Sequence, residues 1–344
     1  MSRQISPESS DGSVANMPFL TIAIPTYNRA AALKQTLGII VPQLDSGSRV
    51  VVIDNASSDD TALVCDSNVR TRAPIEIIRN RVNIGANANI MRCCEQAGDG
   101  YLWILPDDDV PHADAVRTIR EVVARHPRAG YVNFHTTLLE HYRVTRSREI
   151  VVSDASGLAS ELDCFGNLLF LAAGVYSGDF VRAHMIDGYA GIHTSGPSIA
   201  MLLGALARRE TSMVFTPASI CAWGAPPTWD PVAVTRDGYG LVGLLPPGRP
   251  RRLFAKKLFD SFPPRLRRRT DCRSIIDDLA TGPDAIDAAA KRYRFAAGLR
   301  PAFTLPLILA WLARGTAPFG TRAIVRAILR AGLVPTTTAP SSTV

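Results

Sequence analysis

Three consecutive acidic residues, Asp107, Asp108 and Asp109, are the chemically most distinctive feature of the sequence. They follow an apolar segment, residues 101–105, that has the pattern of a buried strand. Carboxylates packed this closely repel one another, by about 4 kcal/mol for unit charges roughly 4 Å apart at an effective dielectric of about 20. A hard cation, Mg²⁺ or Mn²⁺, would offset the repulsion and leave coordination positions open for phosphate oxygens. The alternative is a solvated acidic turn that caps the next helix.

Two further polar clusters follow apolar runs in the same way. Residues 25–29, Pro-Thr-Tyr-Asn-Arg, end the run at 19–24, and residues 54–57, Asp-Asn-Ala-Ser, end the run at 49–53. In a parallel α/β sheet, ligands bind outside the carboxyl ends of the strands. Three strands therefore deliver polar side chains to one edge, and this coincidence favours the metal interpretation of the acids over the solvated turn.

Asp54 and the segment around Gly85 each allow two interpretations. A carboxylate at a strand end can accept hydrogen bonds from a nucleobase edge or a ribose hydroxyl. It can equally cap the following helix, a task that Ser57 or Ser58 could also perform. Asn83 and Gly85 suggest a close backbone approach to a nucleotide, although Asn-x-Gly also forms ordinary turns.

The elements that must position these residues alternate along the first part of the chain. Apolar runs predict strands at 19–24, 49–53, 75–78, 101–105 and 131–134, and helical patterns lie between them, as at 30–40, 87–96 and 113–125. The runs are continuous rather than alternating, as in strands that are covered on both faces. The sequence therefore predicts an α/β fold with a mostly parallel central sheet and a largely helical C-terminal region.

Composition and charge narrow the function class. The chain has 344 residues and a net charge of +7, but residues 249–273 alone carry ten basic and two acidic residues. The basicity is local, which argues against a nucleic-acid partner, whose binding would spread it over the folded face. The six cysteines lack metal or disulfide spacing and indicate reduced thiols in the cytoplasm. No apolar run approaches the roughly 20 residues needed to span a bilayer, and the polar first 16 residues lack a signal-peptide core.

The motifs together resemble a known family. In order and spacing, residues 25–29, 51–59, 79–85 and 105–109 are similar to the family 2 glycosyltransferases of GT-A fold. The stretch 101–109, Tyr-Leu-Trp-Ile-Leu-Pro-Asp-Asp-Asp, particularly resembles abequosyl- and rhamnosyltransferase-like enzymes that build bacterial surface polysaccharides. The resemblance covers about residues 18–135 and implies a nucleotide-sugar domain joined to an acceptor region.

The resemblance also implies roles for matching positions. Asp54 would hold the base, and Asp108 and Asp109 would hold Mg²⁺ or Mn²⁺. The residues expected to line the nucleotide-sugar site are Pro25, Thr26, Tyr27, Arg29, Asp54, Asn55, Asn83, Gly85 and Asp107. The family commonly shows Asp-x-Asp, whereas Pro106 stands here at the first acid position. Either Asp107 and Asp109 form the pair in a shifted register, or Asp108 carries the metal with less help.

The implied reaction moves a sugar from a nucleoside-diphosphate sugar to a hydroxyl of a glycan or lipid-linked acceptor, with inversion. A base for that hydroxyl is then required. The family usually supplies an acid at the start of a helix, but residues 193–198 contain none. The candidates are Asp179, which ranks first, Asp187 and His193; Asp179 could instead cap a helix, and His193 could be structural.

The expected organisation has five parts: a disordered leader at 1–17, the nucleotide-sugar half at 18–140, the acceptor-side half at 141–245, a basic helical region at 246–334 and a disordered tail at 335–344. The basic region combines residues 249–273 with a helical arginine stripe, Arg322, Arg326 and Arg330. This pattern suits peripheral binding to an anionic membrane surface, on its inner face. The alternative is that these helices pack on the catalytic domain with solvated arginines.

Two rival functions remain open at this point. A non-catalytic protein that binds nucleotide sugars, or a scaffold, is compatible with the changed first acid and the missing base. A sugar-1-phosphate nucleotidyltransferase shares the α/β layout, but it needs a Gly-rich phosphate loop with Arg and Lys after the first strand, and residues 25–29 lack that loop.

Overall fold

An eight-stranded sheet forms the centre of the molecule in a computed structural model that describes residues 18–69, 75–136, 146–162, 166–224, 240–245 and 248–260. Six strands run in one direction, and β8 and β7 run against them. The order across the sheet is β3 (Ile75–Arg79), β2 (Ser48–Asp54), β1 (Leu20–Thr26), β4 (Tyr101–Ile104), β8 (Gly174–Ser177), β6 (Tyr131–Asn133), β9 (Met213–Phe215) and β7 (Ile150–Val152). The predicted α/β class with a mostly parallel sheet is confirmed.

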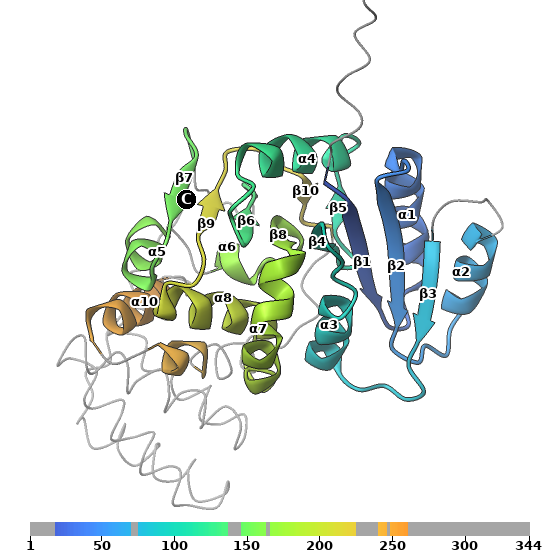
Figure 1. The fold of residues 1–344 in the computed structure, drawn as a ribbon. Helices are drawn as coiled ribbons and strands as arrows, with labels where there is room; N and C mark the ends of the chain where they lie inside the picture. Colours follow the sequence, from blue (N-terminus) through green and yellow to red (C-terminus); the bar gives the residue numbers. More distant parts are fainter. Residues whose placement is uncertain are drawn as a thin grey trace, which may run out of the picture.

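Helices cover both faces of the sheet (Figure 1). Apolar side chains of α1 (Ala30–Ile40), α2 (Thr61–Val69) and α4 (Ala115–Arg125) form one core with Val50 and Val52 of β2. The other core contains Val51 and Ile53 of the same strand. It is built with α3 (Ala86–Cys94), α5 (Ala155–Glu161), α7 (Gly178–Ala190), α8 (Pro197–Arg208) and α10 (Arg249–Asp260). Successive strand residues thus enter opposite cores, which explains the continuous apolar run in β2.

Strand direction brings the polar clusters to one edge. Thr26 at the end of β1 pairs in register with Asp54 at the end of β2. The chain leaves β4 beside β1, where the Leu105 N–H donates to the Ala23 carbonyl over 2.9 Å. We call this side of the sheet the carboxyl edge, and residues 105–109 the acid loop. At the opposite edge, Tyr101 at the start of β4 pairs with Ser177 at the end of β8.

A second, two-stranded sheet lies directly after the acid loop. β5 (Val110–Pro111) pairs antiparallel with β10 (Cys221–Ala222). The described residues also form three short helices: η1 (Val41–Gln43), α6 (Gly166–Leu169) and η3 (Leu171–Ala173). The pairing of β5 with β10 holds residues 220–224, from the distant half of the sequence, against the acid loop.

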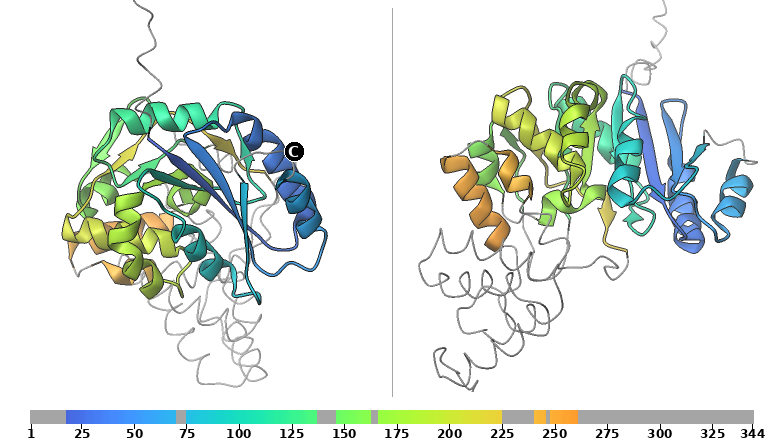
Figure 2. Two further views of the ribbon diagram at one scale, coloured as in Figure 1. Left: turned by 45° about the vertical axis from the view of Figure 1, so that its right-hand side comes forward. Right: turned by 90° about the horizontal axis from the view of Figure 1, so that it is seen from below.

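α10 is the described part of the predicted basic C-terminal region. It packs against α5, with Phe254 fully buried, and lies at the other end of the molecule from β3 and α2 (Figure 2). The leader at 1–17, the arginines at 267–269, the stripe Arg322, Arg326 and Arg330, and the tail at 335–344 lie outside the described residues. Within the described ranges, no helix is long and apolar enough to cross a bilayer.

An ion pair between a buried arginine and a half-exposed aspartate anchors the loop before β2. Arg120 of α4 is buried, and its guanidinium donates to the Asp45 carboxylate, through Nη2 to Oδ1 over 2.7 Å. The hydrogen bond from Arg120 is the largest cause that lowers the pKa of Asp45 to about 2. Because the Arg120 Nε has no partner among the described residues, the pair supplies essential compensation for this buried charge.

We expect Asp45→Ala to lower the free energy of unfolding at pH 7 by about 2 kcal/mol, since it leaves a buried guanidinium without its carboxylate. The folded-state pKa lies below the unfolded value, so this stabilisation is present above about pH 4 and is lost as the pH falls towards 2. Urea unfolding at pH 7 and pH 3 measures both effects. Glu121→Ala, which removes an exposed partner of Arg117, is the control and should change stability little. An equal loss in both variants would contradict the prediction.

Candidate functional site

The three acids of the acid loop turn to different partners. Asp107 is buried, and its Oδ2 accepts a hydrogen bond from Thr26 Oγ1 over 2.6 Å. Asp108 is partly exposed and contacts the guanidinium of Arg29, which also lies 3.5 Å from Asp107 Oδ1. Asp109 is buried and accepts a hydrogen bond from the backbone N–H of Gly224. Asp108 is therefore the carboxylate of the three that is available to a ligand.

Burial changes the charge of the loop. It raises the pKa of Asp107 to about 6 and that of Asp109 to about 8, and neighbouring carboxylates contribute to both shifts. The guanidinium of Arg29, which lies beside Asp107 and Asp108, offsets part of the repulsion among the acids. A divalent cation is therefore not the only source of positive charge for these acids, because Arg29 supplies positive charge from within the chain.

Thr36 of α1 fixes the backbone of the acid loop. Its hydroxyl is buried and donates to the Asp107 carbonyl over 3.0 Å, with the Asp109 carbonyl 3.4 Å away. Sequence reasoning missed this residue. The sequence feature that could have identified Thr36 is its place on the buried face of α1, where the other residues are the apolar Leu33, Leu37 and Ile40.

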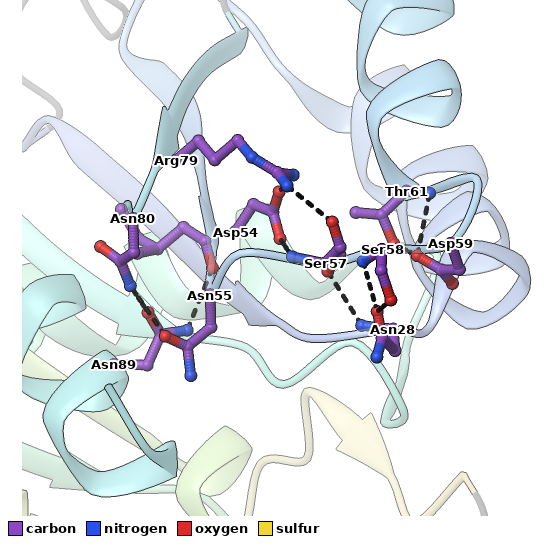
Figure 3. A network of polar contacts seen from close by, with 11 residues as sticks. Asn28, Asp54, Asn55, Ser57, Ser58, Asp59, Thr61, Arg79, Asn80 and Asn89 are labelled. Carbon is purple, nitrogen blue, oxygen red and sulfur yellow. Dashed lines mark hydrogen bonds and ion pairs between the residues drawn. The ribbon is translucent and has the colours of Figure 1, made fainter. Parts of the chain in front are cut away.

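Asp54 combines a capping role with an ion pair. Its Oδ1 accepts the backbone N–H of Ser57 over 2.9 Å, and its Oδ2 contacts Arg79 at the end of β3 (Figure 3). The second guanidinium nitrogen of Arg79 donates to the Ser57 carbonyl over 2.6 Å. Asp54 is 2% exposed and both of its oxygens are engaged, whereas the Arg79 side chain is half exposed. Arg79 therefore presents the more accessible polar group of this pair.

A ladder of asparagines connects the end of β2 to the start of α3. Asn55 donates to Asn83 Oδ1 over 2.8 Å and accepts from Asn80 and from the Ile84 N–H, each over 3.0 Å. Asn83 in turn accepts the Gly85 N–H over 2.9 Å. The predicted residues Asn55, Asn83 and Gly85 are thus brought together.

Asn80 and Asn89 complete the ladder and were not predicted. Asn80 Nδ2 donates to Asn89 Oδ1 over 2.9 Å, and Asn89 Nδ2 donates to the Ile53 carbonyl over 3.0 Å (Figure 3). The ladder fixes the loop before α3, which includes Gly85 with a φ of 86°.

The turn after β1 is tied to the turn after β2. Asn28 has a φ of 53°; its N–H donates to Ser57 Oγ over 2.9 Å, and its Oδ1 accepts the Ser58 N–H over 2.7 Å (Figure 3). Pro25, the residue before the end of β1, pairs with Ile53, and Tyr27 leaves an exposed ring at the carboxyl edge. The two turns are therefore positioned as one unit, from which Arg29 reaches the acid loop.

Of the three candidate bases, Asp179 lies at the opposite edge of the sheet. Asp179 follows the end of β8, where the Gly178 N–H donates to the Gly100 carbonyl over 2.8 Å, at the opposite edge of the sheet. Its carboxylate is exposed and pairs with Arg182. The interpretation of Asp179 as the first candidate is therefore corrected: β8 runs antiparallel to β4, which carries the start of α7 away from the acid loop.

Asp187 and His193 differ in their surroundings. Asp187 accepts a hydrogen bond from Arg208 over 2.6 Å and joins α7 to α8, so it has a structural partner. His193 is exposed and lies between Ile192 and Thr194, whose carbonyls accept hydrogen bonds from Asn87 Nδ2 over 3.0 and 2.6 Å. Because Asn87 stands at the start of α3, His193 lies at the carboxyl edge.

The acidic side chains of the acid loop can hold a metal ion only if a bound molecule or water supplies further ligands. In the part of the chain that the structure describes, no group of three His, Cys, Asp or Glu side chains is arranged to hold a metal ion. Mg²⁺ is nevertheless commonly bound by one or two carboxylates together with phosphate oxygens and water. The guanidinium of Arg29 shows that positive charge is favourable beside Asp107 and Asp108. Asp108, with Asp107 next to it, therefore fits a divalent cation whose other ligands come from a diphosphate.

Sequence comparisons agree with the motifs. Residues 21–159 match the model of glycosyl transferase family 2. The chain is 30% identical over 102 residues to an uncharacterized protein of Mycobacterium tuberculosis, covering 30% of this chain and 31% of that protein. It is 29% identical over 106 residues to the GalNAc(5)-diNAcBac-PP-undecaprenol beta-1,3-glucosyltransferase of Campylobacter jejuni, covering 30% of this chain and 34% of that enzyme. The chain spans about a third of the length of these curated relatives.

Solved structures share the fold. The S. aureus TarS fragment 1–349 in complex with UDP-GlcNAc has a TM-score of 0.57 at 13% identity, covering 91% of this chain and 92% of that one. The mannosyltransferase PcManGT of Pyrobaculum calidifontis, in complex with GDP-Man and Mn²⁺, has a TM-score of 0.53 at 17% identity, covering 93% and 87%. The chain carries a family 2 glycosyltransferase domain on a GT-A fold, as its motifs predict.

Proposed function

We propose that this protein is a glycosyltransferase that moves a sugar from a nucleoside-diphosphate sugar to a hydroxyl of a glycan or lipid-linked acceptor, with inversion and with the help of Mg²⁺ or Mn²⁺. One observation carries the proposal: Thr26 and Arg29 from the end of β1 contact Asp107 and Asp108 after β4, while Asp54 pairs in register with Thr26. Polar residues at the ends of three strands thereby lie at the same carboxyl edge, where α/β sheets bind ligands.

The diphosphate leaving group determines the roles that we assign at the acid loop. Its negative charge grows as the glycosidic bond breaks, so groups that stabilise this charge lower the barrier. A divalent cation, when bound, supplies this stabilisation as a Lewis acid. Asp108 would hold the cation, and Arg29 beside it would bind a phosphate oxygen directly. Thr26 and Thr36 would hold Asp107 and the loop backbone in place.

The nucleoside would lie over the turns after β1 and β2. Tyr27 offers an exposed ring for stacking, and Arg79, which Asp54 holds in place, offers hydrogen-bonding groups for a base or ribose. The asparagine ladder holds Asn83 and Gly85 beside them. For the acceptor hydroxyl, we assign the base to His193, because it lies at the carboxyl edge and is exposed.

The relatives suggest the acceptor class. The C. jejuni relative is named for an undecaprenol-linked substrate, and TarS and PcManGT were solved with UDP-GlcNAc and GDP-Man. We propose by analogy a role in polysaccharide biosynthesis with peripheral binding to the inner face of the membrane. The described basic residues Arg249 and Arg252 of α10, with the arginines at 267–269 outside the described residues, are the candidate membrane contacts.

Calorimetric titration with UDP-, GDP- and dTDP-sugars, with and without Mn²⁺, tests the proposed function. We expect one donor to bind and to be turned over slowly by hydrolysis when no acceptor is present. Asp54→Asn should weaken donor binding by about 10- to 100-fold, because it disturbs the pair with Arg79 and the turn at Ser57. Asp60→Asn, an exposed acid near the same turn, should bind the donor as the wild type does. Binding without any turnover would favour the non-catalytic alternative, and no nucleotide binding would refute the proposal.

A further inference from the structure

Arg29 occupies the place beside the acid loop where a metal ion would bring its charge. Its guanidinium contacts Asp108 Oδ2 and lies 3.5 Å from Asp107 Oδ1. The Arg29 and Asp108 side chains are each 32% exposed, and Asp107 is 5% exposed. The pair is therefore partly sheltered from solvent, where interactions between charges are stronger than at a fully exposed surface.

The backbone holds Arg29 at this position. Asn28 is anchored to Ser57 and Ser58 by hydrogen bonds, and the Arg29 carbonyl accepts the Leu33 N–H in the first turn of α1 over 3.0 Å. Arginine also keeps its charge at any physiological pH, so it cannot make room for another cation by losing a proton. A metal ion that approaches Asp108 must therefore share the carboxylate with the guanidinium or displace it.

Displacement requires another anion for the guanidinium. A diphosphate suits this purpose, because guanidinium groups bind phosphate oxygens well and a diphosphate also supplies metal ligands. We propose that Arg29 competes with the metal for Asp108 and thereby makes metal binding conditional on the nucleoside diphosphate. This inference rests on the proposed function of the site, since it names the order in which that site takes its ligands.

The affinities for the metal and for the nucleotide are thermodynamically linked. If nucleotide raises the affinity for the metal, the metal raises the affinity for the nucleotide by the same factor. A diphosphate contributes metal ligands in any variant, so coupling by itself does not identify Arg29. The distinguishing quantity is the affinity for the metal in the absence of nucleotide, which should rise when the competing guanidinium is removed.

The experiment titrates Mn²⁺ into the full chain and measures free Mn²⁺ by electron paramagnetic resonance, without nucleotide and then with UDP or GDP. The wild type should bind Mn²⁺ weakly until nucleotide is added. Arg29→Gln should bind Mn²⁺ at least about tenfold more tightly without nucleotide, a difference of about 1.4 kcal/mol. Arg29→Lys keeps the positive charge and should stay near the wild type.

Two controls assign the effect to this site. Arg79→Gln removes a similar arginine–aspartate pair at the same edge, but Asp54 has no neighbouring acid at its strand end, so nucleotide-free Mn²⁺ affinity should not rise. Adding Asp108→Asn to Arg29→Gln should abolish the gain. Thermal melts establish that each variant is folded.

Tight Mn²⁺ binding by the nucleotide-free wild type, or an unchanged affinity in Arg29→Gln, would overturn the inference. So would an equal gain in Arg79→Gln. Failure of the proposed function would look different: no UDP-, GDP- or dTDP-sugar would bind in the presence or absence of Mn²⁺, while the nucleotide-free comparison of Arg29→Gln with the wild type would still report on Arg29.

Discussion

Asp108→Asn is expected to lower turnover of the donor by about 100- to 1,000-fold, the usual cost of removing one group that stabilises charge in the transition state. The substitution keeps the shape of the side chain but removes the negative charge that would hold the cation. Asp108 is partly exposed, so its replacement should leave the melting temperature close to that of the wild type. Release of nucleoside diphosphate, measured at saturating donor and Mn²⁺, gives the rate.

Asp179→Asn is the matched control for this prediction. Asp179 is also an acid in contact with an arginine, but it lies at the opposite edge of the sheet. Its replacement should leave turnover within about twofold of the wild type, in line with the small effects of exposed pairs. Near-normal turnover in Asp108→Asn would refute the metal assignment, and a large loss in Asp179→Asn would show that the structural correction is wrong.

Gly224→Ala is expected to have the second-largest effect on turnover. A Cβ atom at this position would lie 1.9 Å from the Asp108 carbonyl oxygen and 3.2 Å from the Asp109 Cα. Real contacts of 1.9 Å do not occur, so the backbone of the acid loop or of residues 220–224 must move. A misplacement of about 1 Å at a reacting site can cost about 100-fold in rate, and we expect a loss of that order. The lost fit should also lower the free energy of unfolding by about 1–3 kcal/mol.

Gly38→Ala provides the comparison. Gly38 lies inside α1, and a Cβ there would have no heavy atom within 4 Å. Alanine favours helix over glycine by roughly 0.5–1 kcal/mol, so this variant should be as stable as the wild type or slightly more stable, with unchanged turnover. Measuring turnover and urea unfolding for both variants separates a local effect on the acid loop from general instability. Wild-type turnover in Gly224→Ala would contradict the close contact on which the prediction depends.

The sequence motifs do not predict the hydrogen bonds of the asparagine ladder. Asn55, Asn83 and Gly85 were assigned to the nucleotide because they match a family pattern, and the structure shows that they also bond to one another. Asn80 and Asn89 connect the ladder to the end of β2 and were not singled out. Such residues position a loop through contacts that depend on three elements meeting, so no single segment carries their signal.

The sequence alone predicts the class of fold, which the structure confirms, and the edge of the sheet at which the proposed site would lie. Apolar runs such as residues 49–53 predict strands from local composition, and polar residues that end several parallel strands must meet at one edge. That is why Thr26, Asp54 and Asp108 could be assigned to one place before any contact was known. The family resemblance came from the same short segments, whose spacing is a local property of the chain.

Which side chains meet and which are kept apart depends on how the strands and helices pack together. The contact of Arg29 with Asp108 joins residues 79 positions apart, and Asp54 meets Arg79 because β2 and β3 pair in register. Asp179 was misplaced because strand direction is set by pairing: β8 runs antiparallel to β4, so the helix after it starts at the far edge. Composition predicts a strand, but its direction and its neighbours come from the packing of the whole sheet.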